Sequence, residues 1–212
     1  MPDIAAKKFF VGRDYLCLQD YTPEEILYML KVAKELKEER KAGIPHPILQ
    51  GKILAMIFTK SSTRTRVAFE AGMLQLGGHA LFLSNRDIQI GRGEPIKDTA
   101  RVLSRMVDGI MIRTYDHQDV VELAEYATVP VINGLSDFLH PTQVLADLLT
   151  IQEHKKRLKG LKMTYIGDGN NMANSLMFAG KMGMHVVIAS PPDYKPDAQL
   201  FAKASEQAKQ NG

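Results

Sequence analysis

The chain has 212 residues, enough for one complete domain and part or all of a second, and its net charge of +3 is mild. No basic run interleaved with aromatic residues indicates nucleic-acid binding, and no apolar stretch is long enough for a membrane span or a signal peptide. Cys17 is the only cysteine, which excludes an intrachain disulfide and a multi-cysteine metal site and favours a reducing, cytoplasmic location.

The first predicted element is a helix that starts at Thr22-Pro23-Glu24-Glu25, where Thr22 can cap, Pro23 fits the first position and Glu25 can complete a capping box. Apolar runs and helical patterns then alternate along the chain. Strands are predicted at 53–58, 80–83, 109–112 and 129–132, and helices at 63–76, 96–106 and 117–127. The alternation predicts an α/β fold, a parallel sheet with helices on both faces.

A long helix is predicted at 141–156, and a new strand–helix–strand unit follows it. The unit comprises a strand at 163–166, a glycine-rich turn from Gly167 to Asn170, a helix at 172–182 and a strand at 185–189. This pattern predicts the start of a second, Rossmann-like domain, so that residues 1–150 form one domain and 151–212 part of another. The turn lacks the G-x-G-x-x-G spacing, so it gives little support to nucleotide binding.

The segment 60–70, KSSTRTRVAFE, lies where the first strand turns into a helix with Val67, Ala71 and Leu74 on its apolar face. Exposed backbone N–H groups and the positive end of the dipole favour an anion at such a point. Hydroxyl donors and arginine forks suit a phosphate. A helix cap with solvated arginines is the plainer interpretation, but six polar donors in one turn favour phosphate binding.

Polar residues also follow two other predicted strands. Arg113 follows the third strand, and His140-Pro141-Thr142-Gln143 ends the loop after the fourth. In an open parallel sheet, ligands bind off the carboxyl ends of the strands, so these groups would share one rim with the segment 62–66. Taken singly, Arg113 could be a surface residue and His140 a helix cap.

These motifs together resemble the aspartate/ornithine carbamoyltransferase family. The matching segments are S-T-R-T-R (62–66), D-T-A-R-V-L-S-R (98–105), I-R-T (112–114) and H-P-T-Q (140–143). Within the family the chain is most similar to the ornithine carbamoyltransferases, on the evidence of G-R-G-E-P-I-K-D-T (91–99), A-D-L-L-T-I-Q-E-H (146–154) and G-D-G-N-N-M-A-N-S (167–175).

The resemblance implies a role for each matching residue. Residues that would bind the phosphate of carbamoyl phosphate are Ser62, Thr63, Arg64 and Thr65. Arg113 would bridge the phosphate and the carbonyl oxygen, His140 would contact that oxygen, and Gln143 would contact the carbamoyl NH2. Asn171 would hold L-ornithine. The family also implies a homo-oligomer, specifically a trimer, in which Gln89 reaches a neighbouring subunit's site.

The implied reaction is attack by the uncharged side-chain amine of ornithine on the carbamoyl carbon, giving citrulline and phosphate with neither metal nor organic cofactor. Arg113, His140 and Thr65 would form the oxyanion site. A carbamoyltransferase for putrescine or another amine, and an inactive fragment that binds carbamoyl phosphate, are the alternatives. Because the family's S-M-G and H-C-L-P segments are absent, we expect the chain to be truncated at its C-terminus.

Overall fold

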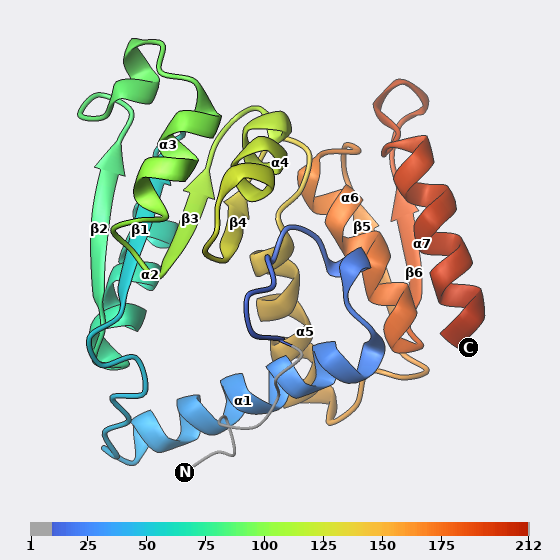
Figure 1. Cartoon of the computed structure of the whole chain (residues 1–212). Coiled ribbons are helices and arrows are strands. Elements are labelled where there is room, and N and C mark those ends of the chain that lie inside the picture. Colours follow the sequence, from blue (N-terminus) through green and yellow to red (C-terminus); the bar gives the residue numbers. More distant parts are fainter. Residues whose placement is uncertain (1–9, 212) are drawn as a thin grey trace. The chain divides into compact units, whose positions relative to one another are not determined.

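The computed structural model describes residues 10–211 and divides them into two compact units (Figure 1). Among the described residues, the first unit comprises residues 10–16 together with Val32–Ser136, and the second comprises Cys17–Lys31 and residues 137–211. The chain passes between the units at three points, and the second of these falls within helix α1 (Pro23–Lys41). A boundary between functional domains near residue 150 stays a prediction.

The first unit is built on a four-stranded parallel sheet with the strand order β2-β1-β3-β4 (Figure 1). The strands are β1 (Ile53–Phe58), β2 (His79–Ser84), β3 (Gly109–Arg113) and β4 (Val131–Leu135). The connecting helices are α2 (Thr63–Gln75), α3 (Ile96–Leu103) and α4 (His117–Tyr126). The predicted α/β fold is confirmed, and each predicted strand and helix of this unit is present.

Helices cover both faces of this sheet. Successive residues of the buried central strand β1 point to opposite faces, so this strand packs against helices on both sides. Ala55 and Ile57 pack into an apolar cluster with α3 and α4, which contribute Ala100 and Leu123. On the other face, Leu54, Met56 and Phe58 pack with Met73 and Phe69 of α2. The buried run at 53–58 therefore supplies both cores, as expected of a parallel strand.

The apolar face of α2 differs from the prediction. Val67 and Leu74 were expected to face the core, but they are 55% and 64% exposed. Phe69 and Met73, four residues apart on another side of the helix, pack against the sheet instead. The cause is that α2 carries two apolar stripes, and the bulkier one is buried.

The strand order reverses direction between β1 and β3, and in open parallel sheets the crevice that binds ligands lies at the carboxyl ends of such a strand pair. From β1 the chain crosses to β2 on one side, and from β3 it crosses to β4 on the other. With right-handed crossovers, α2 and α4 then lie on opposite faces and leave the sheet in opposite directions. The backbone N–H groups of Thr59 and Lys60 donate to the carbonyl oxygen of Arg113, at 3.0 and 3.3 Å. These bonds join the two strand ends at the mouth of the crevice.

The second unit contains the predicted start of a Rossmann-like fold, with β5 (Lys162–Ile166) and β6 (His185–Ala189) paired in parallel. Its helices are α5 (Pro141–Lys155), α6 (Asn171–Leu176) and α7 (Ala198–Asn211). The helix predicted at 172–182 is α-helical only as far as Leu176, and it continues as the 3-10 helix η5 (Met177–Met182). All six residues of η5 are buried, so the sequence has no polar face there from which to read a helical period.

The N-terminal part of the second unit is fixed by polar contacts. The predicted capping box is present: the N–H of Thr22 donates to Glu25 at 2.9 Å, and the N–H of Glu25 donates to Thr22 Oγ1 at 3.3 Å. The buried ammonium of Lys181 donates to the carbonyl oxygens of Leu18, Gln19 and Tyr21, at 3.1, 3.0 and 2.7 Å.

Within residues 10–211, none of the helices combines the length and apolar character needed to cross a membrane.

Candidate functional site

The start of α2 forms a compact hydroxyl cluster at the carboxyl end of β1. Ser62 is the N-cap, and its Oγ accepts from the backbone N–H of Thr65 at 3.2 Å. The Ser62 hydroxyl also donates to Thr65 Oγ1 at 3.1 Å. An N-cap serine and the hydroxyl of the third helical residue thus share the positive end of the helix, where an anion is stabilised.

Arg113 brings a positive charge to this cluster from the neighbouring strand. It is the last residue of β3, and its register partner on β1 is Phe58. One guanidinium nitrogen, Nη1, donates to Thr65 Oγ1 at 3.3 Å. Thr63 and Arg64 lie in the same first turn of α2 and are exposed. The crevice therefore has a cation, two hydroxyls and a helix N-terminus on one rim, which is the chemistry of an oxyanion site.

The second arginine of the α2 segment contacts other side chains of the first unit. Arg66 Nε donates to Glu70 at 3.1 Å, and the Arg66 guanidinium lies 3.6 Å from the centre of the Phe82 ring. A guanidinium over an aromatic face is held by a cation–π interaction. Because Phe82 belongs to β2 and also packs against Phe58, with ring centres 5.2 Å apart, Arg66 fixes α2 to the sheet.

A chain of three side chains behind the crevice was missed by the sequence analysis. The Thr59 hydroxyl contacts the Thr114 hydroxyl at 2.9 Å, and Thr114 donates to a carboxylate oxygen of Asp119 at 2.7 Å. Thr59 follows β1, Thr114 follows β3 and Asp119 lies in the first turn of α4. The one signal in the sequence is a threonine directly after each of two neighbouring strands.

A second contact joins the start of α4 to the end of β4. His117 Nδ1 and Ser136 Oγ are 2.8 Å apart, and Ser136 is fully buried. Burial lowers the pKa of His117 below its usual value, and the nearby Asp116 carboxylate opposes this in part. The loop after β4 is therefore tied to the helix after β3.

Gln89 is exposed and begins the short 3-10 helix η4 (Gln89–Arg92), between β2 and α3. The backbone N–H of Glu94 donates to the carbonyl oxygen of Gln89 at 3.1 Å. The Glu94 carboxylate in turn accepts from the buried Thr99 hydroxyl at 3.0 Å. The C-terminal end of the loop that carries Gln89 is thus anchored to α3.

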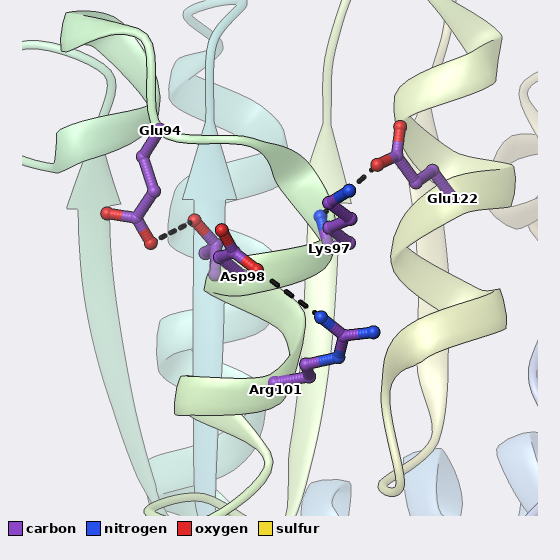
Figure 2. A network of polar contacts seen from close by, with 6 residues as sticks. Glu94, Lys97, Asp98, Arg101 and Glu122 are labelled. Atoms are coloured by element: carbon purple, nitrogen blue, oxygen red, sulfur yellow. Dashed lines mark hydrogen bonds and ion pairs between the residues drawn. The ribbon is translucent and has the colours of Figure 1, made fainter.

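Figure 2 shows the polar contacts around the start of α3. The backbone N–H of Lys97 donates to Glu122 of α4 at 3.3 Å, and Arg101 and Asp98 form an exposed pair at 3.4 Å (Figure 2). Exposed pairs of this kind contribute little to stability, about 0.3–0.5 kcal/mol. The Arg101–Asp98 pair lies within α3, and the bond from Lys97 to Glu122 connects α3 with α4.

The remaining predicted residues belong to the second unit. His140 precedes α5, and its Nδ1 lies 3.3 Å from the Thr142 hydroxyl. Gln143 is exposed in the first turn of α5, and its amide nitrogen donates to Asp147 at 3.0 Å. His140 occupies the N-cap position of α5, as the helix-cap alternative expected, but its side chain makes no capping hydrogen bond to α5.

Asn171 is the first residue of α6 and is partly buried. The preceding residue, Asn170, caps the helix by accepting from the N–H groups of Met172 and Ala173, at 2.8 and 3.3 Å. Gly169 fits this turn because an added Cβ would lie 2.2 Å from the backbone of Lys195 and Pro196. The glycine-rich turn therefore serves close packing in front of α6 and leaves Asn171 at the carboxyl edge of β5.

The first unit thus brings together Ser62, Thr65 and Arg113, and the second unit carries His140, Gln143 and Asn171. A cavity of about 500 Å³ in the first unit lies at the other edge of the sheet, around Leu49, Pro130 and the Lys52–Asp108 ion pair, and is mostly apolar. Across residues 10–211, no three His, Cys, Asp or Glu side chains are grouped to hold a metal ion.

Two family models match the chain. The aspartate/ornithine carbamoyltransferase carbamoyl-P binding domain matches residues 13–153, and the Asp/Orn binding domain of the same family matches residues 159–212.

Individual relatives agree with the family models. The ornithine carbamoyltransferase of Pyrococcus abyssi is 61% identical over 202 residues, which are 95% of this chain and 64% of that protein. A protein of Carboxydothermus hydrogenoformans with the same name is 60% identical over an equal stretch. The chain thus spans slightly less than two thirds of the length of these relatives.

Solved structures give the same result. The ornithine carbamoyltransferase of Pyrococcus furiosus has a TM-score of 0.93 at 59% identity, covering 95% of this chain and 65% of that one. A mitochondrial ornithine carbamoyltransferase from Coccidioides immitis has a TM-score of 0.86 at 36% identity, covering 94% of this chain and 66% of that one. By sequence and by fold, the chain belongs to the aspartate/ornithine carbamoyltransferase family.

Proposed function

We propose that the full-length protein is an ornithine carbamoyltransferase. The observation that carries the proposal is the cluster of Ser62, Thr65 and Arg113 at the start of α2, where hydroxyls, a guanidinium and a helix N-terminus meet. In the proposed reaction the side-chain amine of ornithine forms a C–N bond to the carbamoyl carbon. The C–O bond to phosphate breaks, and the amine gives its proton to phosphate or to solvent.

The phosphate half of the site would be formed by residues 62–65 with Arg113. Backbone N–H groups and hydroxyls at the start of α2 suit the phosphate oxygens, and Arg64 would add a charge-assisted contact from its exposed position. Arg113, already at Thr65, would reach both the phosphate and the carbonyl oxygen. Stabilising the departing phosphate and the oxyanion with fixed donors is how such a site accelerates the reaction.

The carbonyl half would be formed by His140 and Gln143, and their neighbours support these roles. A Thr142 hydroxyl that donates to His140 Nδ1 leaves the ring proton on Nε2, which can then donate to the carbonyl oxygen. Asp147 engages the amide nitrogen of Gln143, which directs the amide oxygen toward the carbamoyl NH2 as an acceptor. Both side chains would be oriented before the substrate binds.

The choice of ornithine is supported by the names of the relatives and by Asn171, which would bind the amino-acid part of the substrate. One relative of 60% identity, from Pyrococcus furiosus, is named as the anabolic enzyme, which supports a role in arginine biosynthesis. A cytoplasmic location is supported by the single cysteine. Burial raises the pKa of the Cys17 thiol to about 12, so this thiol stays protonated and unreactive.

The test of the function is citrulline formation by the full-length protein with ornithine, putrescine and aspartate in parallel. Turnover with ornithine alone is the expected result, and turnover with putrescine alone would replace the proposal.

Arg64→Ala should weaken carbamoyl phosphate binding by about 10- to 150-fold, the equivalent of about 1.5–3 kcal/mol. Arg105→Ala, an exposed arginine after α3, is the matched control. Equal calorimetric affinities for both variants would overturn the phosphate site.

His140→Ala should instead lower turnover by about 100- to 1,000-fold, because one oxyanion donor is removed. Its effect on the affinity for inorganic phosphate should be small. A loss of phosphate affinity as large as the loss of turnover would move His140 into the phosphate site and away from the carbonyl oxygen.

The proposed enzyme is a homo-oligomer, a trimer by its family resemblance, in which Gln89 completes the site of a neighbouring subunit. Support comes from the exposed stripe of Val67 and Leu74, seven residues apart on one face of α2, and from exposed Leu81 on the edge strand β2. Mixing Arg64→Ala chains with Gln89→Ala chains tests this. Shared sites would recover activity in mixed oligomers, whereas sites built within one chain would stay inactive.

A further inference from the structure

Two buried side chains of α6 hold the loop that carries His140. Ser175 Oγ accepts from the backbone N–H of His140 at 2.8 Å, and Asn174 Nδ2 donates to the carbonyl oxygen of Phe138 at 3.1 Å. Ser175 is 2% exposed and Asn174 is 4% exposed. Both bonds are therefore shielded from water, and the loop is attached to α6 at two points two residues apart.

The same helix begins with Asn171. On an α-helix, residues three and four positions apart lie on one side, so Asn174 and Ser175 continue the side of α6 that Asn171 opens. Asn174 also accepts from the N–H of Asp197 at 3.0 Å, and Asp197 caps α7 by accepting from Leu200 at 2.8 Å. Asn174 thus joins the 137–140 loop, α6 and the start of α7.

We infer that Ser175 and Asn174 are positioning residues that keep His140 at a fixed position relative to Asn171. This inference rests on the proposed function, in which His140 binds the carbonyl oxygen and Asn171 the attacking amino acid. The carbonyl carbon and the amine must meet within a few tenths of an ångström of the reactive geometry. A displacement of about 1 Å can cost about 100-fold in rate. A loop attached directly to the helix of the second substrate prevents such a displacement.

The segment G-D-G-N-N-M-A-N-S (167–175) ends in Asn174 and Ser175, which are buried in the protein. Asn170 caps α6 and Asn171 would bind ornithine. The final pair would contact no substrate and would act through His140. The segment then couples the two substrates, in addition to binding one of them.

The test compares Ser175→Ala with Ser175→Thr in the full-length protein. Removing the hydroxyl should lower kcat by about 10- to 100-fold while the affinity for inorganic phosphate changes less than twofold. Ser175→Thr, which keeps an acceptor oxygen, should recover most of the lost turnover. Ser205→Ala on α7 is the matched control and should have the kcat of the wild type. A kcat within twofold of the wild type for Ser175→Ala would overturn the inference.

His140→Ala, measured in parallel, separates this inference from the proposed function. If His140→Ala abolishes turnover and Ser175→Ala does not, only the inference fails. If His140→Ala keeps normal turnover, the role of His140 and the inference fail together. A measurement without any variant guards against misfolding: the His140 amide proton, bonded to a buried acceptor, should exchange slowly with solvent deuterium. Rapid exchange of that amide would also overturn the inference.

Discussion

Thr114→Val is the most informative perturbation of the first unit, because it removes one hydroxyl and almost no volume. Thr114 is 1% exposed and lies between Thr59 and Asp119, at 2.9 and 2.7 Å. Valine has the same shape, so no cavity forms and the loss is that of the two hydrogen bonds. We expect the variant to be less stable and to hold the loop from Thr59 to Ser62 less firmly, since Thr59 begins that loop.

The size of the effect follows from the two bonds. The bond to the Asp119 carboxylate is charge-assisted and contributes about 1.5–3 kcal/mol, and the bond between the threonines contributes about 0.5–1.5 kcal/mol. Asp119 is partly exposed, so water replaces part of its lost donor. The expected loss in the free energy of unfolding is therefore about 2–3 kcal/mol.

Native-state hydrogen exchange of the amides in β1 and β3 measures this loss within the first unit. Thr114→Ser keeps the hydroxyl and should lose less than about 1 kcal/mol, and Thr59→Val, which breaks one of the two bonds, should fall between the two. If Thr114→Val and Thr114→Ser are equally stable, the hydroxyl contributes nothing and the chain of contacts is incidental.

Two further predictions concern buried ionisable groups. Because the pKa of His117 is lowered by burial, the unfolded chain binds more protons below about pH 6.5, so stability should fall as pH drops through that range. His117→Gln should flatten this dependence in urea unfolding at pH 5–7.5, exposed His185→Gln should not, and an unchanged slope in both would contradict the reasoning. Lys181→Met should cost about 2–4 kcal/mol, because three carbonyl groups lose the ammonium donor, although two of them keep another hydrogen bond, whereas exposed Lys209→Met should change stability by less than about 0.5 kcal/mol. Equal denaturation midpoints for the two lysine variants would show that the Lys181 contacts are not stabilising.

The parts of the fold and site that sequence reasoning predicted are those coded by neighbouring residues. The run at 53–58 is buried on both faces, so its apolar continuity alone predicted β1. Ser62 and Thr65 are three residues apart and meet within one helical turn. Arg113 was predicted because it directly follows an apolar strand, and strand ends of a parallel sheet share one edge.

The parts that were missed depend on residues distant in sequence or on patterns without contrast. Thr59 and Thr114 are 55 positions apart, and nothing near either one specifies the other. Ser175 and His140 are 35 positions apart and meet through a backbone N–H, which carries no residue identity. The wrong face of α2 has a different cause: Val67 and Leu74 form an apolar stripe as regular as that of Phe69 and Met73, and only packing decides between them.

Substitutions of the residues predicted from the sequence and of those missed should have different effects. Groups predicted from neighbouring residues, such as Ser62, Thr65 and Arg64, lie at the proposed ligand surface, so their loss should appear first as weaker binding. Groups coded by distant pairs, such as Thr114 and Ser175, lie behind that surface and contact only protein. Their loss leaves each binding group in place but allows it to move, which costs alignment of the reactants more than affinity. A chain in which both classes changed kcat and affinity in the same proportion would be one in which binding and alignment are not separated in this way.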